Sequence, residues 1–496
     1  MRKRVSRILA RSVKLITAGL LLSCSQDPGP LPNIVMIVAD DLGWRDLGFM
    51  GSSYYETPNM DRLAGEGRVF MQGYAAAANC APSRACLMTG RYSPAHGVYT
   101  VGSSERGDER LRKIIPAENR QVLPGEFITL AETLGEAGYT TLSIGKWHLG
   151  EDPCSQGFDL NVGGGHWGHP KSYFAPYTSP DLEAPEGEYL TDRLTGEAIR
   201  FVREHADVPF FLYLPYYAVH SPIQAKPPFE EKYLEKGARG CQGNAGYAGM
   251  VDNLDRCIGL LMDEISTLGL DQHTLVIFTS DNGGIRDISC QDPLRAGKGS
   301  YYEGGIRVPL VFRWPGRIIR GVEWQTPAIN IDFFPTILDL LGLDPGSPSK
   351  AETGEDNHGK KPVDRLDGIS LWPLLSEGKD LPERSLFFHF PVYLQAYRAC
   401  YDDGRDPLFR TRPGSVIRKG DWKLHYFYED GAVELYNLKN DLGERHDLSG
   451  EKPSLSKELI TELKVWLEGY DAPVAFEPNP AYDPEFEKEQ LTLHAH

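Results

Sequence analysis

Short apolar runs that alternate with longer amphipathic stretches limit what this chain can fold into. Runs of strand length lie at 34–39, 141–144, 210–214 and 274–278. Stretches with helical periodicity lie between them, at 130–137, 192–205 and 247–268. Strands that alternate with helices predict an α/β fold, in which helices flank a large, mostly parallel or mixed sheet. In such folds the chemistry lies at the carboxyl ends of the strands.

A second, smaller unit is predicted toward the C-terminus. Residues 344–367 are rich in glycine, proline, serine and charge, which is typical of an exposed loop. Farther on, Glu429-Asp430-Gly431 separates two strand-like stretches and predicts a β-hairpin, and 454–467 has the pattern of an amphipathic helix. We therefore expect a main domain over 33–367 and a C-terminal α+β subdomain, built on an antiparallel sheet, over 368–496.

The N-terminus has the pattern of an export signal. Basic residues precede an apolar stretch at 15–22 that is too short to span a bilayer. It ends in Leu21-Leu22-Ser23-Cys24, which is similar to the lipobox of bacterial lipoproteins. We expect 1–24 to be a lipoprotein-type signal peptide and 25–32 a linker, with plain secretory cleavage near Ser23 as the alternative. Either route exports the protein, to the periplasm or, as a lipoprotein, to the outer membrane of a Gram-negative bacterium.

Charge and cysteine content narrow the expected partners. A formal charge of −17 repels nucleic acid and anionic lipid, so we expect no nucleic-acid partner and membrane contact only through a lipid on Cys24. An anion-binding site in such a chain has to be basic locally. Besides Cys24 and Cys80, six cysteines allow many disulfide pairings, and their spacing selects none. They are Cys86, Cys154, Cys241, Cys257, Cys290 and Cys400.

The most specific motif is Cys80-Ala81-Pro82-Ser83-Arg84, followed by Thr89-Gly90-Arg91. A buried cysteine beside a proline turn would also explain the first element. Together the two elements resemble the maturation signature of the sulfatase family, C-x-P-S-R followed by T-G-R. The resemblance implies a sulfuric ester hydrolase with a fold like that of alkaline phosphatase. It also implies that a maturation enzyme oxidises Cys80 to formylglycine, whose hydrate attacks sulfur with one oxygen and expels sulfate with the other.

Oxygen-bearing side chains follow two of the predicted strands. Asp40 and Asp41 follow the first run, and Asp281 and Asn282 follow the last. Parallel strands would bring them to one edge of the sheet, where carboxylates and an amide suit Ca²⁺ or Mg²⁺ rather than zinc. Alone, each pair could instead be a helix cap or a tight turn. In the resembling family these positions hold one Ca²⁺, which also contacts the residue made from Cys80. We therefore expect Ca²⁺, with Mg²⁺ as the second choice.

Basic side chains complete the predicted site. Lys146 and His148 follow the run at 141–144, and His220 opens an H-x-P element after the next run. Lys298 lies in a later glycine-rich element, and the resemblance places all of these around the sulfate. The implied roles are that Arg84 orients the formylglycine hydrate, while Lys146 and Lys298 neutralise the sulfuryl oxygens. His220 is the expected general acid for the departing alcohol, and His148 the base that deprotonates the hydrate.

A carbohydrate substrate is suggested by two segments. The glycine-rich loop at 163–169 and the aromatic segment at 387–401 could line a sugar cleft, although such rings also serve packing alone. The resemblance extends to exo- and endo-acting sulfatases of sulfated polysaccharides such as carrageenan, ulvan or glycosaminoglycan. Two alternatives stay open: a phosphonate or phosphate monoester hydrolase of the same superfamily, and a catalytically inactive, glycan-binding lipoprotein.

Overall fold

The computed structural model describes residues 31–343, 365–398 and 401–494. The expected signal peptide, the lipobox and nearly all of the expected linker lie outside the described residues, as does most of the loop at 344–367. From Pro32 onward the chain forms one compact unit, so the domain boundary at residues 367 and 368 stays a prediction.

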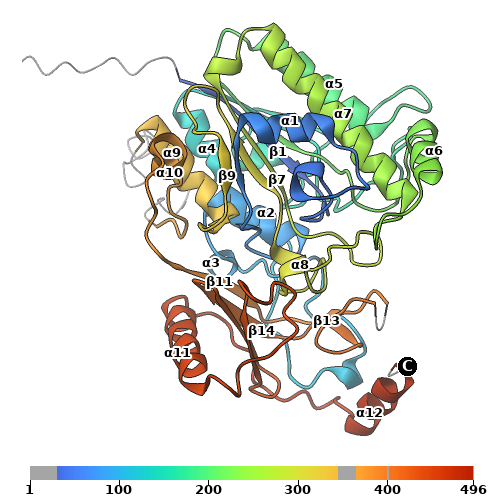
Figure 1. Cartoon of the computed structure of the whole chain (residues 1–496), viewed down its shortest axis with the longest axis vertical. Helices are drawn as coiled ribbons and strands as arrows, with labels where there is room; N and C mark the ends of the chain where they lie inside the picture. Colours follow the sequence, from blue (N-terminus) through green and yellow to red (C-terminus); the bar gives the residue numbers. More distant parts are fainter. Residues whose placement is uncertain (1–30, 344–364, 399–400, 495–496) are drawn as a thin grey trace, which may run out of the picture. The chain divides into compact units, whose positions relative to one another are not determined.

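A large mixed sheet has the strand order β5-β4-β6-β1-β7-β8-β2-β9 (Figure 1). The four predicted strands, β1, β4, β6 and β7, are neighbours and run parallel, which confirms the α/β prediction. β8 is antiparallel to both β7 and β2. The strands span Asn33–Ala39 (β1), Arg68–Phe70 (β2), Thr140–Ile144 (β4), Leu160–Val162 (β5), Phe210–Pro215 (β6), Thr274–Ser280 (β7), Leu310–Arg313 (β8) and Gly321–Glu323 (β9).

Helices cover both faces of this sheet, which explains why β1 is apolar throughout rather than alternating. Val35 and Ile37 pack into one apolar layer, and Ile34 and Met36 into the other. The first layer lies under α1 (Pro58–Glu66), α5 (Leu190–Glu204) and α7 (Ala245–Thr267). The second lies under α2 (Cys80–Thr89), α4 (Leu130–Glu136), α9 (Phe333–Leu341) and α10 (Trp372–Glu377). The other helices of this part are α3 (Ser93–His96), α6 (Pro227–Lys236) and α8 (Glu303–Ile306).

The C-terminal part holds a four-stranded antiparallel sheet in the order β11-β14-β15-β16, as expected. Its strands span Ser385–Phe390 (β11), Gly414–Lys419 (β14), Trp422–Phe427 (β15) and Val433–Asn437 (β16), so the predicted hairpin is confirmed. Helix α11 (Pro453–Gly469) packs on this sheet through Leu459 and Leu463 (Figure 1). The remaining elements are β3 (Gly73–Tyr74) paired with β10 (Ala328–Ile329), β12 (Leu394–Gln395) paired with β13 (Phe409–Thr411), and α12 (Pro484–Leu493).

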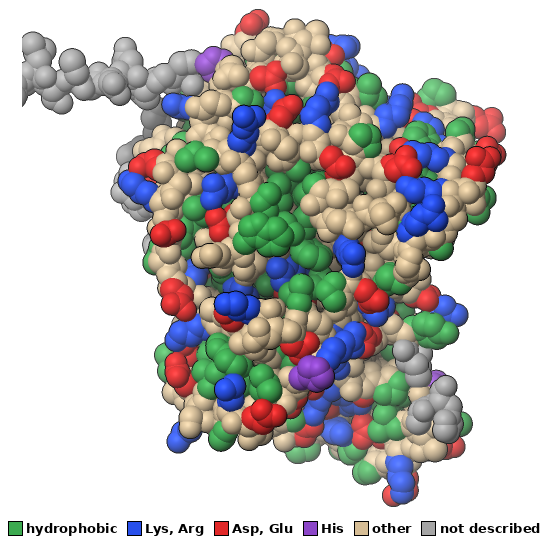
Figure 2. All heavy atoms as spheres, in the orientation of Figure 1, with side chains coloured by type: hydrophobic (Ala, Val, Ile, Leu, Met, Phe, Trp, Pro, Cys, Tyr) green, Lys and Arg blue, Asp and Glu red, His purple; other side chains and the backbone are tan. Residues whose placement is uncertain are grey.

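Cysteine pairing and surface charge complete the description. A disulfide joins Cys241 to Cys290, whereas Cys80, Cys86, Cys154 and Cys257 are free. Cys24 and Cys400 lie outside the described residues. None of the helices in the described ranges has the length and apolar character that a membrane crossing needs. Figure 2 shows acidic and basic side chains interspersed on one face, so the net negative charge is not gathered there.

Candidate active site

The carboxyl ends of four adjacent strands bring the predicted residues together. Asp40 and Asp41 follow β1, Asp281 follows β7, Lys146 follows β4 and His220 follows β6. Because these strands are parallel neighbours, their ends meet at one edge of the sheet. Cys80 is the first residue of α2, whose N-terminus points its free amide groups toward the same edge.

The acidic side chains form a tight buried group. Asp41 adopts a left-handed backbone with φ of 59°, and its amide donates to Asp281 Oδ1 at 3.3 Å. Its Oδ1 accepts from Asn282 Nδ2 at 2.8 Å. Cys80 Sγ lies 3.5 Å from Asp40 Oδ1. One ligand atom from each of Asp40, Asp41, Cys80 and His220 lies within 4.8 Å of the others, as in a metal site.

Asp281 and Asn282 belong to this group in different ways. Asp281 is engaged by Arg84, whose Nε and Nη2 lie 2.9 and 2.8 Å from Oδ2, so only Oδ1 of this carboxylate faces Asp41. Asn282 is buried, and its Oδ1 has no hydrogen-bond partner within the described part of the chain. A buried amide oxygen without a partner beside carboxylates fits the oxygen-only ligand set that a hard cation takes.

Two lysines bring positive charge to the carboxylates. Lys146 Nζ lies 2.7 Å from Asp40 Oδ2, and Lys298 Nζ lies 2.7 Å from both oxygens of Asp41. Burial raises the pKa of Asp40 despite the Lys146 charge. Burial acts on Asp41 in the same direction, but the charges of Lys298, His220 and Lys146 together outweigh it and lower the Asp41 pKa. With Arg84 on Asp281, three cations thus balance the three carboxylates, so the group is not acidic although the protein as a whole is.

Two histidines lie beside this group. His220 Nε2 lies 3.5 Å from Asp41 Oδ2, and burial together with the Lys298 charge lowers its pKa. His148 has a left-handed backbone with φ of 63°, and its Nδ1 has no hydrogen-bond partner among the described residues. Burial and the Lys146 charge lower the pKa of His148 well below its usual value. Burial and the Lys146 charge therefore favour the neutral form of His148.

Residues that the sequence did not single out also take part. The exposed ring of His169 stacks on His220 with centroids 5.5 Å apart and planes 10° apart. Gly168 lies against His148, since a Cβ there would come within 2.6 Å of His148 Cε1. Both residues belong to the glycine-rich loop at 163–169, whose composition was the only signal for them. Asn330 holds the first turn of α2 by donating to the Ser83 hydroxyl at 2.9 Å.

Most aromatic side chains of the segment at 387–401 pack inside the protein rather than lining the site. Phe387 stacks on Trp466 at 4.7 Å, and Phe388 and Phe390 are buried in an apolar cluster. Tyr397 and Tyr401 are instead 47% and 58% exposed, and Arg410 connects Tyr397 to the site because it lies against the Tyr397 ring and donates to the Lys298 backbone oxygen. Of the expected sugar cleft, the loop at 163–169 and Tyr397 thus lie beside the site, and the β11 aromatics do not.

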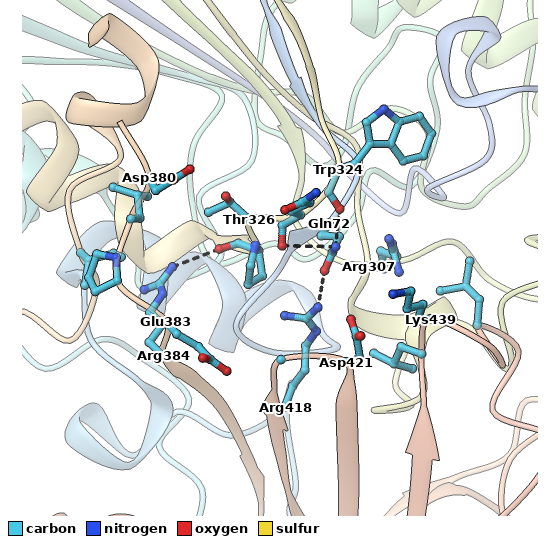
Figure 3. Close-up of a pocket in the computed structure, with 18 residues that line it drawn as sticks. Gln72, Arg307, Trp324, Thr326, Asp380, Glu383, Arg384, Arg418, Asp421 and Lys439 are labelled. Carbon is cyan, nitrogen blue, oxygen red and sulfur yellow. Dashed lines mark hydrogen bonds between the residues drawn. The ribbon is translucent and has the colours of Figure 1, made fainter. Parts of the chain in front are cut away.

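A cavity of about 770 Å³ lies elsewhere (Figure 3). Gln72 and Trp324 line it from the large sheet, and Arg418 and Lys439 line it from the C-terminal sheet. Arg418 donates to Gln72 across the cavity, as Figure 3 shows. The residues that line this cavity include none of the group around Cys80. This cavity is therefore a seam between the two sheets rather than part of the candidate active site.

Comparison with known proteins agrees with the motifs. The family model for sulfatases matches residues 32–343, and the model for the C-terminal part of N-sulphoglucosamine sulphohydrolase matches 297–471. The chain is 34% identical to a sulfatase of Formosa agariphila, over 93% of this chain and 94% of that protein. It is 35% identical to the N-acetylgalactosamine-6-sulfatase of Mus musculus, over 77% and 72% of the two chains.

The fold is also similar to solved structures. The crystal structure of Ps i-CgsB superposes with a TM-score of 0.69 and 30% identity, covering 94% of this chain and 98% of that one. The same protein has been solved in complex with k-i-k-neocarrahexaose. These matches cover the residues that form the group around Cys80. The chain thus belongs to the sulfatase family and is a sulfuric ester hydrolase.

Proposed function

We propose that this sulfatase hydrolyses the sulfate esters of a sulfated carbohydrate, using formylglycine made from Cys80 and one bound Ca²⁺. The observation that carries the proposal is the position of Cys80, at a helix N-terminus and within reach of Asp40, Asp41 and His220. An anion is stabilised there by the helix amides. A nucleophile at this point faces the two lysines that would hold the sulfate.

Ca²⁺ would be held by Asp40, Asp41, Asp281 and Asn282, together with the side chain made from Cys80. The support is chemical: all four protein ligands offer oxygen, and Asn282 Oδ1 is buried without a partner among the described residues. The ion, when bound, would polarise a sulfate oxygen and lower the pKa of the nucleophilic hydroxyl.

The protein side chains divide the remaining work. The formylglycine hydrate supplies two hydroxyl oxygens, one to attack sulfur and one to expel sulfate as the aldehyde re-forms. Lys146 and Lys298 hold the sulfuryl oxygens, because their ammonium groups border the site where the sulfate would lie. Arg84 lies four residues after Cys80 on the same helix face, and its ion pair with Asp281 keeps that face oriented.

The two histidines take opposite roles in proton transfer. His220 would protonate the departing alcohol oxygen, since Asp41 and Asp40 favour its protonated form and a bound sulfate would offset the Lys298 charge. His148 would take the proton from the hydroxyl that expels sulfate, because its lowered pKa keeps it neutral and its Nδ1 has no partner in the described chain.

A carbohydrate is the substrate class that the surroundings favour. The loop at 163–169 lies beside His220, where the leaving group would be, and it presents His169 to solvent. Two similar proteins have carbohydrates in their descriptions. The mouse relative is named N-acetylgalactosamine-6-sulfatase, and Ps i-CgsB was solved in complex with k-i-k-neocarrahexaose. The proposal covers exo- and endo-acting cleavage alike.

Export is part of the proposal. The Cys241–Cys290 disulfide is typical of an oxidising compartment such as the periplasm. Lipid attachment at Cys24 would then tether the enzyme to the outer membrane.

The test is peptide mass spectrometry across Cys80, paired with sulfate release from sulfated oligosaccharides by protein made with a maturation system. We expect conversion of Cys80 to the aldehyde, and release that is abolished by Cys80→Ala and by chelation. A converted protein that releases no sulfate from any ester would refute the proposal. Turnover of phosphonate monoesters, or glycan binding without turnover, would then identify the alternative.

A further inference from the structure

A basic and aromatic group continues from Lys298 toward solvent. Arg410, on β13, donates from Nη1 to the Lys298 backbone oxygen at 3.3 Å and from Nε to the Gln395 backbone oxygen at 3.0 Å. Its guanidinium carbon lies 3.4 Å from the centre of the Tyr397 ring. Arg410 is 4% exposed and Tyr397 is 47% exposed. A buried cation is thus placed beneath a ring that solvent reaches, next to the catalytic lysine.

Arg106 joins this group from a different part of the chain. Ser104 accepts from the Tyr393 amide at 3.0 Å, and a Cβ on Gly107 would meet the Phe409 ring at 2.8 Å. Residues 104–107 therefore lie along the β12–β13 pair. The Arg106 guanidinium donates to the Val101 backbone oxygen, and burial together with the Arg410 charge lowers its pKa.

Neither arginine has a carboxylate partner within the described residues. Arg412, two residues beyond Arg410, shows the usual arrangement: its guanidinium meets Asp406 at 2.6 Å, Glu429 at 2.9 Å and Glu487 at 3.0 Å. Burial raises the pKa of Asp402, which the Arg410 charge offsets only in part, and Asp402 Oδ2 accepts from the Tyr397 amide at 2.6 Å rather than from either arginine. The chain has 69 acidic and 52 basic residues, so a shortage of carboxylates does not explain why these two arginines form no ion pair.

Two adjacent cations without a counterion are costly in a folded protein unless something else neutralises them. Arg410 contacts the backbone oxygen of Lys298, whereas the ammonium of Lys298 contacts Asp41, so the Arg410 charge lies beside the position proposed for the scissile sulfate rather than upon it. A ligand that reaches both places has to carry two negative groups on one scaffold. Beside an exposed ring, that scaffold fits a sugar, whose apolar face stacks on aromatic side chains.

We infer that Arg106, Arg410 and Tyr397 form a subsite for a second anionic group, a sulfate or a carboxylate, on the sugar that carries the scissile sulfate or on its neighbour. The inference rests on the proposed function and names its substrate class: glycans with at least two negative groups close together. Tyr397 stacks on the sugar ring of the substrate, and the two arginines bind its second anionic group.

The experiment measures kcat and KM for four substrates: an aryl sulfate, a monosulfated disaccharide, the same disaccharide with a second sulfate, and a counterpart with a uronate carboxylate. We expect Arg106→Ala to lower kcat/KM for the doubly charged disaccharides by roughly 10- to 100-fold, since that is the range for a hydrogen bond to a charged group. The loss should appear mainly in KM. The aryl sulfate, which does not reach the subsite, should change by less than about twofold.

Matched variants separate binding from folding. Arg62→Ala removes one positive charge from the exposed surface of α1 and should leave all four substrates unchanged. Arg106→Lys should retain part of the preference, because the charge remains without the planar fork. Arg410→Lys repeats the test at the buried position, and thermal unfolding of each variant verifies that it is folded.

The outcomes are distinct. Equal kcat/KM for singly and doubly charged disaccharides, unaltered by Arg106→Ala, overturns the subsite while the sulfatase proposal stands. Absence of sulfate release from every ester, with Cys80 converted, overturns the proposed function instead. In that case, calorimetry measures how tightly the doubly sulfated disaccharide binds to Cys80→Ala, with and without Arg106→Ala. Weaker binding with Arg106→Ala supports the subsite, and equal binding overturns it. A loss confined to the sulfate or to the uronate substrate identifies the anion that the arginines bind.

Discussion

Lys423 and Glu303 form a fully buried ion pair that ties the C-terminal sheet to the large-sheet region. The Lys423 ammonium on β15 lies 2.9 Å from Glu303 Oε1 at the start of α8, and neither side chain is exposed. Glu444 lies 2.9 Å from the same ammonium, and Arg307 lies 3.0 Å from Glu303 Oε2. Lys298 lies in the loop directly before α8, and the Gly304 amide of α8 donates to the Arg295 backbone oxygen of that loop at 2.9 Å, so the ion pair also anchors the loop that carries Lys298.

Stability should therefore fall in mild acid. Burial alone would raise the pKa of Glu303, but the Lys423 and Arg307 charges outweigh burial and lower it from 4.5 to about 2. A lowered folded-state pKa contributes stability above pH 4.5 that is lost as the pH falls toward 2, on the scale of about 3 kcal/mol. Urea unfolding between pH 6 and pH 3 measures the loss, and Glu303→Gln should flatten it. An unchanged slope in Glu303→Gln would show that other acids dominate.

Calcium should stabilise the folded protein through Asn282. Ion binding to the folded state alone adds about 2.7 kcal/mol when free Ca²⁺ is 100 times its Kd. Asn282→Ala removes the buried amide oxygen, so the rise in unfolding temperature on adding Ca²⁺ to chelator-treated protein should shrink. Asp263→Ala, which alters an exposed acid on α7, should keep the full rise. An equal rise in both variants would exclude Asn282 as a ligand.

The two histidines should fail at different steps. His220→Ala should lower kcat/KM for a sugar sulfate by roughly 10²- to 10⁴-fold, and by less for an aryl sulfate whose leaving group needs no proton. His148→Ala should release one equivalent of alcohol and then stop, because sulfate is not expelled. Rapid-quench measurement of alcohol and sulfate separates the two. A burst in His220→Ala but not in His148→Ala would reverse the assigned roles.

Gly168 should control the position of His148. An added Cβ would lie 2.6 Å from His148 Cε1, so Gly168→Ala has to displace the ring or the loop. We expect kcat to fall roughly 10- to 100-fold, the cost of a misplaced catalytic group. Gly196→Ala is the control, since a Cβ at that exposed position in α5 meets no atom within 4 Å. Similar kcat values for the two variants would mean that the loop at 163–169 moves to accommodate the added Cβ without displacing His148.

Much of the architecture follows from local pattern. The apolar run that forms β1 and the aspartates directly after it predict both a buried parallel strand and an oxygen-rich site at its end, because strand ends converge regardless of the loops between them. The hairpin around Gly431 was equally predictable, since a turn and two flanking strands are contiguous in the chain.

The features that escaped prediction depend on contacts between distant segments. The unpaired state of Arg410 cannot be read from its neighbours, because Arg412 two residues later is fully paired. His169 stacks on His220 because the conformation of the loop at 163–169 brings it there, and loop conformation carries little periodic signal. The Cys241–Cys290 pair was one of many that the spacing allowed.

The burial of Cys80 sets an order of events during biosynthesis. Its side chain is 2% exposed, in the first turn of a helix whose ten residues are all buried. An enzyme that oxidises this side chain has to enclose it, which the folded protein does not permit. The proposed conversion to formylglycine would therefore have to come before the helix docks, and two competing rates, that of oxidation and that of folding, would then set the fraction of active molecules.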